Sequence, residues 1–320
     1  MEYILIAAAL LILLLFYFRI ADRYNIIDRP NERSSHTQVT LRGAGVIFYA
    51  GVMLWFFRSG GMYPWFFAGL TAISLISFLD DVYTLSNRIR LSVHLLSVLL
   101  MMYQLELLVF HWYGILMALI LVIGIINAYN FMDGINGITA AYSFAVLLLL
   151  WWVNREVAFI DDRLLYYTAL ANAVFTFYNF RNKARCFAGD VGSVSMSFIL
   201  IFAVASLMIK TGNPVYIMFF AVYGADTVLT IIHRLFRREN IFKAHRLHLF
   251  QYLANEAGGN RLVISFAYGV LQLLIGYLVL RMRGEVVEAQ LIVSAMILFI
   301  LCTLYVGIKG FIVKKYALRL

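Results

Sequence analysis

Four polar side chains recur every three residues in the stretch 127–137, which separates two apolar segments. They are Asn127, Asn130, Asp133 and Asn136. At a helix end this spacing places side chains on neighbouring positions of one side, and two glycines in the same stretch let the backbone approach a ligand closely. Amide oxygens and a carboxylate suit a hard cation, and open backbone suits a phosphate. The stretch therefore predicts a cation–phosphate site, with a polar helix-to-helix turn as the alternative interpretation.

Two adjacent acids, Asp80 and Asp81, close a second apolar segment. Mutual repulsion and removal from water disfavour two ionised carboxylates at a membrane boundary, unless an ion or a basic partner offsets the penalty. The pair therefore predicts a site that activates a nucleophile or holds a metal. The alternative is a polar end to the segment, with Arg88 and Arg90 as nearby counter-charges.

A third acid, Asp190, follows a short basic cluster in the sequence Gly189-Asp-Val-Gly-Ser193. Asp190 and Ser193 could simply cap the helix that begins here. The functional interpretation makes Asp190 a magnesium ligand, because a metal–diphosphate site needs a carboxylate for the ion and nearby arginines for the remaining phosphate charge.

Two histidines, His245 and His248, flank Arg246 in a polar segment near the C-terminal third of the chain. Zinc is excluded because no third ligand follows at a suitable spacing. The remaining interpretations are an interfacial amphipathic segment, or a pair of donors to a diphosphate with Arg246 and Arg237 completing the clamp.

One carboxylate, Asp226, lies inside a predicted membrane span. A charged group at the bilayer centre costs about 2.5–3.5 kcal/mol, so Asp226 is expected to be paired or functional. His233 follows two turns later on the same helix face, with Arg237 one turn further. A structural pair that holds the span to its loop and a direct chemical role both stay open.

The loop after the first apolar segment carries His36 and Arg42 among several basic residues. Alone, such a loop predicts contact with anionic lipid. Beside a phosphate site, the same residues would supply further anion contacts.

The composition decides what kind of protein must position these side chains. Of 320 residues, 63% are hydrophobic and 13% charged, and mean hydropathy is +0.85, which predicts an all-α polytopic membrane protein. The net charge of +9 does not indicate nucleic acid, because the basic residues lie in loops between apolar segments. Cys186 and Cys302 stand too far apart to indicate a disulfide framework or a thiolate metal site.

We expect a single domain, 1–320, with eleven membrane spans and an uncleaved first span. Twenty of the 26 Lys and Arg fall on one side of these spans and six on the other, which places the first side in the cytoplasm, the N-terminus outside and the C-terminus inside. All the candidate site residues except Asp226 lie on that cytoplasmic side, and Asp226 is near it. The expected spans are 3–20, 43–57, 62–79, 91–110, 112–128, 138–153, 164–180, 192–209, 214–232, 262–280 and 288–308.

Taken together and in order, these motifs resemble the polyprenyl-phosphate N-acetylhexosamine-1-phosphate transferases, glycosyltransferase family 4, which also contains the phospho-MurNAc-pentapeptide transferases. The resemblance covers nearly the whole chain. It implies transfer of a sugar 1-phosphate from a UDP-N-acetylhexosamine to undecaprenyl (polyprenyl) phosphate, with release of UMP and Mg²⁺ (or Mn²⁺) as cofactor. It further implies a bacterial cytoplasmic-membrane location and the first membrane step of cell-envelope polysaccharide synthesis, such as O-antigen or cell wall. A homodimer belongs to the same expectation.

The resemblance also implies roles for individual residues. Asp190 would ligate the metal with Asn130, and Asp80 or Asp81 would deprotonate or orient the lipid phosphate, with Asp133 as a further catalytic acid. Asp226 and Asn136 would support the site. The substrate-binding residues would be Asn127, Arg88, Arg42, His36, His245, Arg246 and His248.

Several positions depart from the family pattern. Thr84 stands where a third acid usually follows the acid pair, Asn136 replaces an Asp, and Arg88 takes the place of a lysine. Arginine still binds phosphate but does not exchange a proton. The histidine segment lacks the Phe-Glu ending typical of the MurNAc-pentapeptide branch, so the sequence favours a simpler sugar donor.

Functions of other classes remain to be compared. A transporter or lipid flippase would spread its acids along a path across the bilayer, whereas here they gather at one side. A CDP-alcohol phosphatidyltransferase would carry four aspartates in one short stretch, which this sequence lacks.

Overall fold

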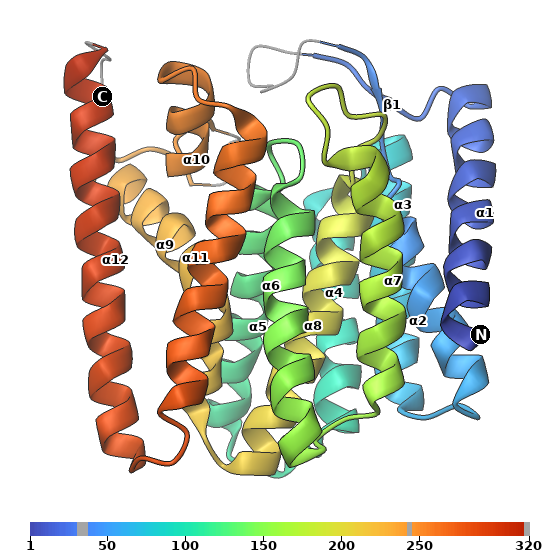
Figure 1. Cartoon of the computed structure of the whole chain (residues 1–320), viewed down its shortest axis with the longest axis horizontal. Helices are drawn as coiled ribbons and strands as arrows, with labels where there is room; N and C mark the ends of the chain where they lie inside the picture. Colours follow the sequence, from blue (N-terminus) through green and yellow to red (C-terminus); the bar gives the residue numbers. More distant parts are fainter. Residues whose placement is uncertain (31–37, 242–244, 317–320) are drawn as a thin grey trace.

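The computed structural model describes residues 1–30, 38–241 and 245–316 as a bundle of long helices that run roughly parallel or antiparallel to one another (Figure 1). Apart from one pair of two-residue strands, its described regular elements are helical, so the all-α prediction is confirmed. In chain order the elements are α1 (Glu2–Arg23), β1 (Ile27–Asp28), β2 (Thr40–Leu41), α2 (Val46–Arg58), α3 (Pro64–Tyr83), α4 (Asn87–Gln104), η1 (Leu107–Val109), α5 (Trp112–Met132), α6 (Ile138–Val157), α7 (Asp162–Asn179), α8 (Gly189–Thr211), η2 (Pro214–Phe220), α9 (Ala221–Phe236), α10 (Leu249–Gln251), η3 (Tyr252–Glu256), α11 (Arg261–Arg281) and α12 (Val287–Lys315).

Within the described residues, eight helical segments are long and apolar enough to cross a membrane. They are α1, α3, α5, α6, α8, η2 with α9, α11 and α12. Helix α2 is apolar but shorter, and the more polar α4 and α7 stand beside the others in the bundle. Each of the eleven predicted spans falls on one of these helical segments. The protein is therefore a multi-pass membrane protein, and the count of eleven crossings stays a prediction.

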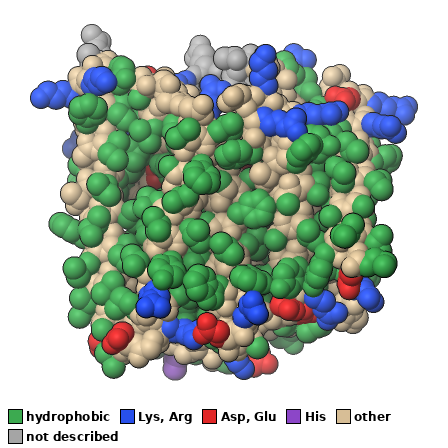
Figure 2. All heavy atoms as spheres, viewed as in Figure 1, with side chains coloured by type: hydrophobic (Ala, Val, Ile, Leu, Met, Phe, Trp, Pro, Cys, Tyr) green, Lys and Arg blue, Asp and Glu red, His purple; other side chains and the backbone are tan. Residues whose placement is uncertain are grey.

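The surface supports this assignment. Figure 2 shows hydrophobic side chains over the middle of one face, whereas Lys, Arg, Asp and Glu gather at its two ends. A helix in lipid satisfies its own backbone hydrogen bonds, so a hydrophobic exterior is stable there. We call one end of the bundle the basic end: it holds the described parts of the connections α1–α2, α3–α4, α5–α6, α7–α8 and α9–α11 (Figure 1). The other end is called the far end.

Helix α8 forms the centre of the bundle. Its apolar stretch is 78% buried, against 22% for α5 and 17% for α12 at the periphery. The crossing with α2 is close, because a Cβ on Gly45 would stand 2.1 Å from the Cα of Gly192. Only glycine allows two backbones to meet at this distance. The N-terminal turn of α8 is thereby fixed at the basic end, next to α2.

A short backbone ladder joins the start of the chain to the segment before α8. Strands β1 and β2 pair antiparallel, with Ile27 opposite Leu41. Leu41 also bridges to Cys186, and the Phe187 N–H donates to the Leu41 carbonyl at 2.8 Å. The Ala44 N–H then donates to the Phe187 carbonyl at 3.0 Å. The ladder brings Arg42 next to the first turn of α8, although about 150 residues separate them in sequence.

Candidate active site

Three carboxylates and two guanidiniums meet at the basic end, and we call them the acid–arginine cluster: Asp80, Asp81, Asp190, Arg42 and Arg90. Arg42 lies between two of the acids. Its Nε is 2.7 Å from Asp81 Oδ1, and its Nη2 donates to Asp190 Oδ1 at 3.1 Å. These contacts connect the segment after β2, the end of α3 and the start of α8 in one ion-pair network.

Arg90, on the second turn of α4, completes the network. Its Nη1 is 2.8 Å from Asp80 Oδ2, and its Nη2 is 3.2 Å from Asp190 Oδ2. Asp190 therefore binds one arginine through each carboxylate oxygen. Three carboxyl groups therefore share two guanidiniums, so the cluster holds more acids than basic partners and is suited to a further cation.

Asp81 holds the start of α8 in place. Its two oxygens accept the backbone N–H groups of Asp190, at 2.9 Å, and Val191, at 3.0 Å. The first N–H groups of a helix have no partner within the helix, and a carboxylate there also interacts favourably with the helix dipole. The Asp81 side chain is 0% exposed. It fixes the position of Asp190, whose own side chain is 17% exposed.

Gly189 makes this contact sterically feasible. The residue has φ +72°, and a Cβ at this position would stand 2.4 Å from Asp81 Oδ2. Any larger residue would push the carboxylate away from the helix start and would also strain the backbone. Glycine at position 189 is therefore required by the geometry of the cap.

The C-terminal end of α5 reaches the same place. Ser193, one turn into α8, donates to Asn130 Oδ1 at 2.8 Å. Asp133 follows α5 directly and accepts a hydrogen bond from Thr139 Oγ1 at 2.7 Å. Burial raises the pKa of Asp133 to about 6. The predicted convergence of the asparagine stretch with Asp190 is thus present in the structure.

Comparisons with known proteins agree with this geometry. The model for glycosyl transferase family 4 matches residues 63–210, a segment that contains Asp80, Asp81, Asp133 and Asp190. Over these residues the chain is similar to glycosyl transferase family 4. A probable undecaprenyl-phosphate N-acetylglucosaminyl 1-phosphate transferase from Bacillus subtilis is 22% identical over 315 residues, which covers 88% of this chain and 83% of the relative.

Two further proteins are similar to this chain. The undecaprenyl-phosphate alpha-N-acetylglucosaminyl 1-phosphate transferase of Escherichia coli is 23% identical over 275 residues, covering 77% of this chain and 74% of the relative. A phospho-N-acetylmuramoyl-pentapeptide-transferase from Thermotoga neapolitana is 31% identical over 150 residues, covering 45% of this chain and 47% of the relative. Of these three relatives, the two with the longer matches are the N-acetylglucosaminyl 1-phosphate transferases.

The histidine segment forms a second, buried group that we call the Asp226–His248 cluster: Asp226, Thr230, His248, Tyr268, Tyr305 and Lys309. Asp226 accepts hydrogen bonds from Tyr268 Oη at 2.7 Å and from the Leu249 N–H at 3.1 Å, and its Oδ1 is 3.1 Å from His248 Nδ1. The sequence placed His233 on the same helix face as Asp226. The observed partner is His248 instead, because the loop after α9 folds back over that helix.

Lys309 ties the peripheral helix α12 to this cluster. It is 5% exposed, and its Nζ donates to the Leu247 carbonyl at 2.7 Å and to Tyr305 Oη at 2.8 Å. Tyr305 Oη is in turn 2.8 Å from Thr230 Oγ1, which donates to Asp226. A continuous hydrogen-bonded chain thus runs from α12 to Asp226 and fixes the backbone next to His248.

The histidine segment also packs against the end of α5, close to Asp133. The ring centroids of His245 and Phe131 are 6.3 Å apart, and a Cβ on Gly134 would stand 2.8 Å from the Phe250 ring. Burial lowers the pKa of His245 to about 4, so this ring is neutral at pH 7. Within the described residues, neither His245 Nδ1 nor His248 Nε2 has a hydrogen-bond partner, although both atoms are buried. These nitrogens are available to a ligand.

Some predicted site residues lie elsewhere. Asn136 is 4% exposed and donates to the carbonyls of Arg181 and Asn182, because α5 ends at Met132 and the chain turns away. The expectation that all four polar residues share one side was therefore wrong for Asn136, which has a structural role. Asn127 is half-buried on α5, about one turn before Asn130.

The basic residues predicted to bind substrate also lie in different environments. Arg246 Nη2 is 3.3 Å from Glu256 Oε1, and Arg237 Nε is 3.0 Å from Glu239 Oε1, so both are paired with acids. Arg88 is exposed, and Arg90 binds the acids in its place. His36 lies outside the described residues.

Arg90 was missed as a site residue because the phase of α4 decides between it and Arg88. Ser86 caps this helix by accepting the Ile89 N–H, which sets where its first turn begins. Arg90 then faces α3 and Arg88 faces outward. The capping serine was visible in the sequence and could have indicated the correct arginine.

The donor chemistry around Asp190 fits a magnesium ion. Mg²⁺ usually keeps several waters and is held by one or two protein oxygens together with substrate phosphates. Ser193 links Asn130 to the first turn of α8, because its hydroxyl donates to Asn130 Oδ1 at 2.8 Å and contacts the main-chain carbonyl of Asp190 at 3.4 Å. In the described part of the chain, no group of three or more His, Cys, Asp or Glu side chains is arranged to hold a metal without such a substrate.

Proposed function

We propose that this chain transfers an N-acetylhexosamine 1-phosphate from a UDP-linked donor to undecaprenyl phosphate and releases UMP. The observation that carries the proposal is the acid–arginine cluster at one end of a membrane bundle, whose members other than Arg42 lie in the segment matched by glycosyl transferase family 4. The longer relatives are named as transferases of N-acetylglucosaminyl 1-phosphate to undecaprenyl phosphate, which supports this acceptor and this class of sugar.

The two arginines would bind the phosphates. Arg42 and Arg90 have side chains 33% and 26% exposed, so water already reaches them. A phosphate oxygen can replace a carboxylate oxygen at a guanidinium because both accept paired N–H donors. Attack of one phosphate on another needs the charge of both to be neutralised. Arg42 and Arg90 supply that charge from two sides of Asp190.

Asp190, together with Asn130, would hold Mg²⁺, which when bound supplies further positive charge at the diphosphate. Asp81 keeps Asp190 at its position through the cap on α8. As Arg90 moves to a phosphate, it would leave the acids free for the cation. The ion pairs of Arg42 and Arg90 with the acids thus occupy the positions that the substrate phosphates and the ion would take.

Asp80 and Asp133 are the candidates for handling the acceptor. Asp80 Oδ1 accepts the Leu85 N–H at 2.6 Å while Oδ2 binds Arg90, so its orientation is set from both sides. Asp133 has a pKa of about 6 because it is buried, close to the second pKa of a phosphate monoester, about 6. A proton can therefore pass between Asp133 and the acceptor phosphate with little energetic cost near neutral pH.

The histidine segment would contact the diphosphate or the leaving UMP. His245 and His248 each have a buried ring nitrogen free of partners among the described residues, next to the end of α5. Asp226 orients His248 through Nδ1. The pair thus presents two ring nitrogens for hydrogen bonds to a ligand next to the end of α5.

The location of the reaction follows from the charge asymmetry. Twenty of the 26 Lys and Arg were assigned from the sequence to the basic end, which we propose faces the bacterial cytoplasm. A water-soluble donor reaches this face, and the lipid acceptor reaches it from within the bilayer. The product would enter synthesis of an envelope polysaccharide.

The transporter alternative receives no support from the described carboxylates. Asp80, Asp81 and Asp190 gather in the last turn of α3 and the first turn of α8. Asp226 is bound to Tyr268, His248 and the Leu249 N–H rather than facing a path. A route across the bilayer would need ionisable groups at successive depths.

The direct test supplies purified protein with undecaprenyl phosphate, Mg²⁺ and a panel of UDP-N-acetylhexosamines, and measures UMP release and lipid-linked product. The same preparation with Asp190→Asn serves as the blank for host enzymes. We expect one sugar to turn over far faster than the others. Absence of UMP release with every donor would refute the proposal.

A further inference from the structure

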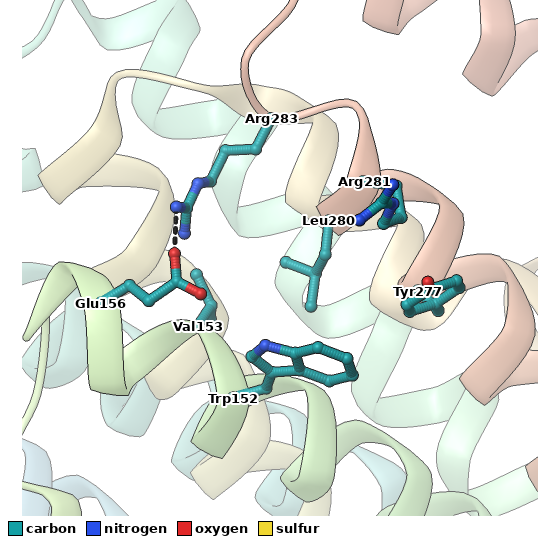
Figure 3. Close-up of a pocket in the computed structure, with 7 residues that line it drawn as sticks. All are labelled: Trp152, Val153, Glu156, Tyr277, Leu280, Arg281 and Arg283. Atoms are coloured by element: carbon teal, nitrogen blue, oxygen red, sulfur yellow. Dashed lines mark hydrogen bonds and ion pairs between the residues drawn. The ribbon is translucent and has the colours of Figure 1, made fainter.

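A pocket of about 160 Å³ lies between the ends of α6 and α11 at the far end of the bundle (Figure 3). This is several times the roughly 30 Å³ that one water molecule occupies in the liquid. It is lined by Trp152 and Glu156 of α6 and by Tyr277, Leu280, Arg281 and Arg283 at and after the end of α11. The reaction proposed above uses none of these residues.

The charges in the pocket do not balance. Arg283 forms an ion pair with Glu156, drawn in Figure 3. Arg281 lines the same pocket and makes no ion pair within the described residues. Two guanidiniums against one carboxylate leave one net positive charge. That charge matches a single phosphodiester, which arginine binds through paired N–H donors.

The other walls belong to a membrane interface. The rings of Trp152 and Tyr277 have centroids 5.7 Å apart, and both side chains are exposed on the outside of the bundle. Trp and Tyr gather at the level of lipid head groups because each has an apolar ring with one polar atom. Leu280 continues the lining with apolar surface. A ligand that is polar at one end and apolar at the other fits these walls.

We propose that this pocket binds the head group of an anionic glycerophospholipid. The phosphate lies between Arg281 and Arg283, and the acyl chains follow the apolar surface where α6 and α11 pack together. A zwitterionic head group fits less well, because the Glu156 carboxylate that would receive its ammonium is already bound to Arg283.

The occupant would stabilise the contact between α6 and the end of α11. Glu156 and Arg283 connect α6 with the segment that leads into α12. A phosphate held by both arginines adds a second connection between the same elements. Because a ligand that binds only the folded state raises its stability, the site predicts lipid-dependent stability.

The test measures thermal unfolding of the full-length protein in neutral detergent with added dioleoyl-phosphatidylglycerol, dioleoyl-phosphatidylethanolamine or inorganic phosphate. We expect phosphatidylglycerol to raise the unfolding temperature by several degrees and the other two by much less. Arg281→Gln should need at least fivefold more phosphatidylglycerol for half of the effect. Lys210 is an exposed residue in the last turn of α8, also at the far end of the bundle. Lys210→Gln is therefore the matched control and should behave as wild type.

Other outcomes overturn the proposal. Equal stabilisation by phosphatidylethanolamine would remove the requirement for an anionic lipid, and equal stabilisation by inorganic phosphate would make this a free-anion site. An unchanged response in Arg281→Gln would place the lipid elsewhere. As a measurement that does not depend on stability, native mass spectrometry should count fewer retained phosphatidylglycerol molecules on Arg281→Gln than on Lys210→Gln.

Discussion

The acid–arginine cluster and the Asp226–His248 cluster both combine carboxylates with cationic side chains near the basic end, yet they differ in access to water. In the first, the side chains of Arg42, Arg90 and Asp190 are 33%, 26% and 17% exposed. In the second, Asp226 and His248 are 3% and 2% exposed. The first cluster can exchange partners with a ligand, whereas the second keeps its partners throughout.

The energies of the two clusters follow from this difference. A partly exposed ion pair contributes about 0–1 kcal/mol, so replacing a carboxylate by a phosphate costs little. Breaking a buried network leaves a charge unpaired and costs about 3–5 kcal/mol. Substitutions in the first cluster should therefore change activity more than stability, and substitutions in the second should change stability first.

The largest effect is expected for Asp190→Asn. The variant should lose at least about 100-fold in turnover, the range seen when one electrostatic contact to the reacting groups is removed. Its unfolding temperature should stay within a few degrees of wild type, because Asp190 is accessible and Asp81 still caps α8. Near-full turnover in this variant would refute its role as the metal ligand.

Arg90→Gln should follow, with a loss of about 10- to 100-fold in kcat/KM, since one phosphate contact is lost. Arg90→Lys should recover part of that loss because it keeps the charge but not the paired donors. Arg88→Gln is the matched control on the exposed face of the same helix. If Arg88→Gln were the more damaging variant, the assignment of Arg90 to the site would be wrong.

Lys309→Met should lower the free energy of unfolding by about 1–3 kcal/mol, because the Leu247 carbonyl and Tyr305 Oη lose a buried donor. Turnover should fall several-fold through the histidine segment. Hydrogen exchange should report faster opening of residues 247–251 but not of the first turn of α8. Lys315→Met, at the exposed end of α12, is the control.

The smallest effect concerns Asp133 and pH. Its pKa is raised from 3.8 to about 6 by burial, so the folded state favours the protonated acid. That contribution to stability is present at low pH and is lost as pH rises through about 6. Asp133→Asn should therefore unfold no lower than wild type at pH 8, and any advantage should shrink as pH falls below 6 and vanish below about pH 4.

A scan of unfolding temperature against pH for both proteins tests this expectation. A variant clearly less stable than wild type at pH 8 would mean that ionised Asp133 is stabilised by a partner. The advantage of the wild type in turnover, by contrast, should persist wherever Asp133 is ionised.

The sequence predicted the helices well because each is a long apolar segment, and it placed the acids together because basic loops indicated one common side. Both signals, the length of an apolar segment and the charge of the adjoining loop, are read from residues close together in the sequence. The fourth span was less accurate: α4 ends at Gln104, where the chain turns through Glu106 in a left-handed conformation, rather than at 110.

Contacts between distant segments were beyond the sequence patterns. The pairing of Asp226 with His248 depends on a loop folding back over α9, and no periodicity encodes that path. The cap that Asp81 provides for α8 likewise joins residues about 110 positions apart. Adjacent acids such as Asp80 and Asp81 look alike in the sequence, but α3 turns Asp80 toward Arg90 and turns Asp81 toward Arg42 and the start of α8.

The Asp81 cap makes the position of Asp190 independent of most of the connections around it. Asp81 on α3 accepts two backbone N–H groups of α8. The carboxylate of Asp190 is therefore positioned by these two helices rather than by the connections between helices. Those connections are then free to change length and composition without disturbing the chemistry. The segment between α7 and α8 is an exception, because its Phe187 backbone also positions Arg42 through Leu41 and Ala44.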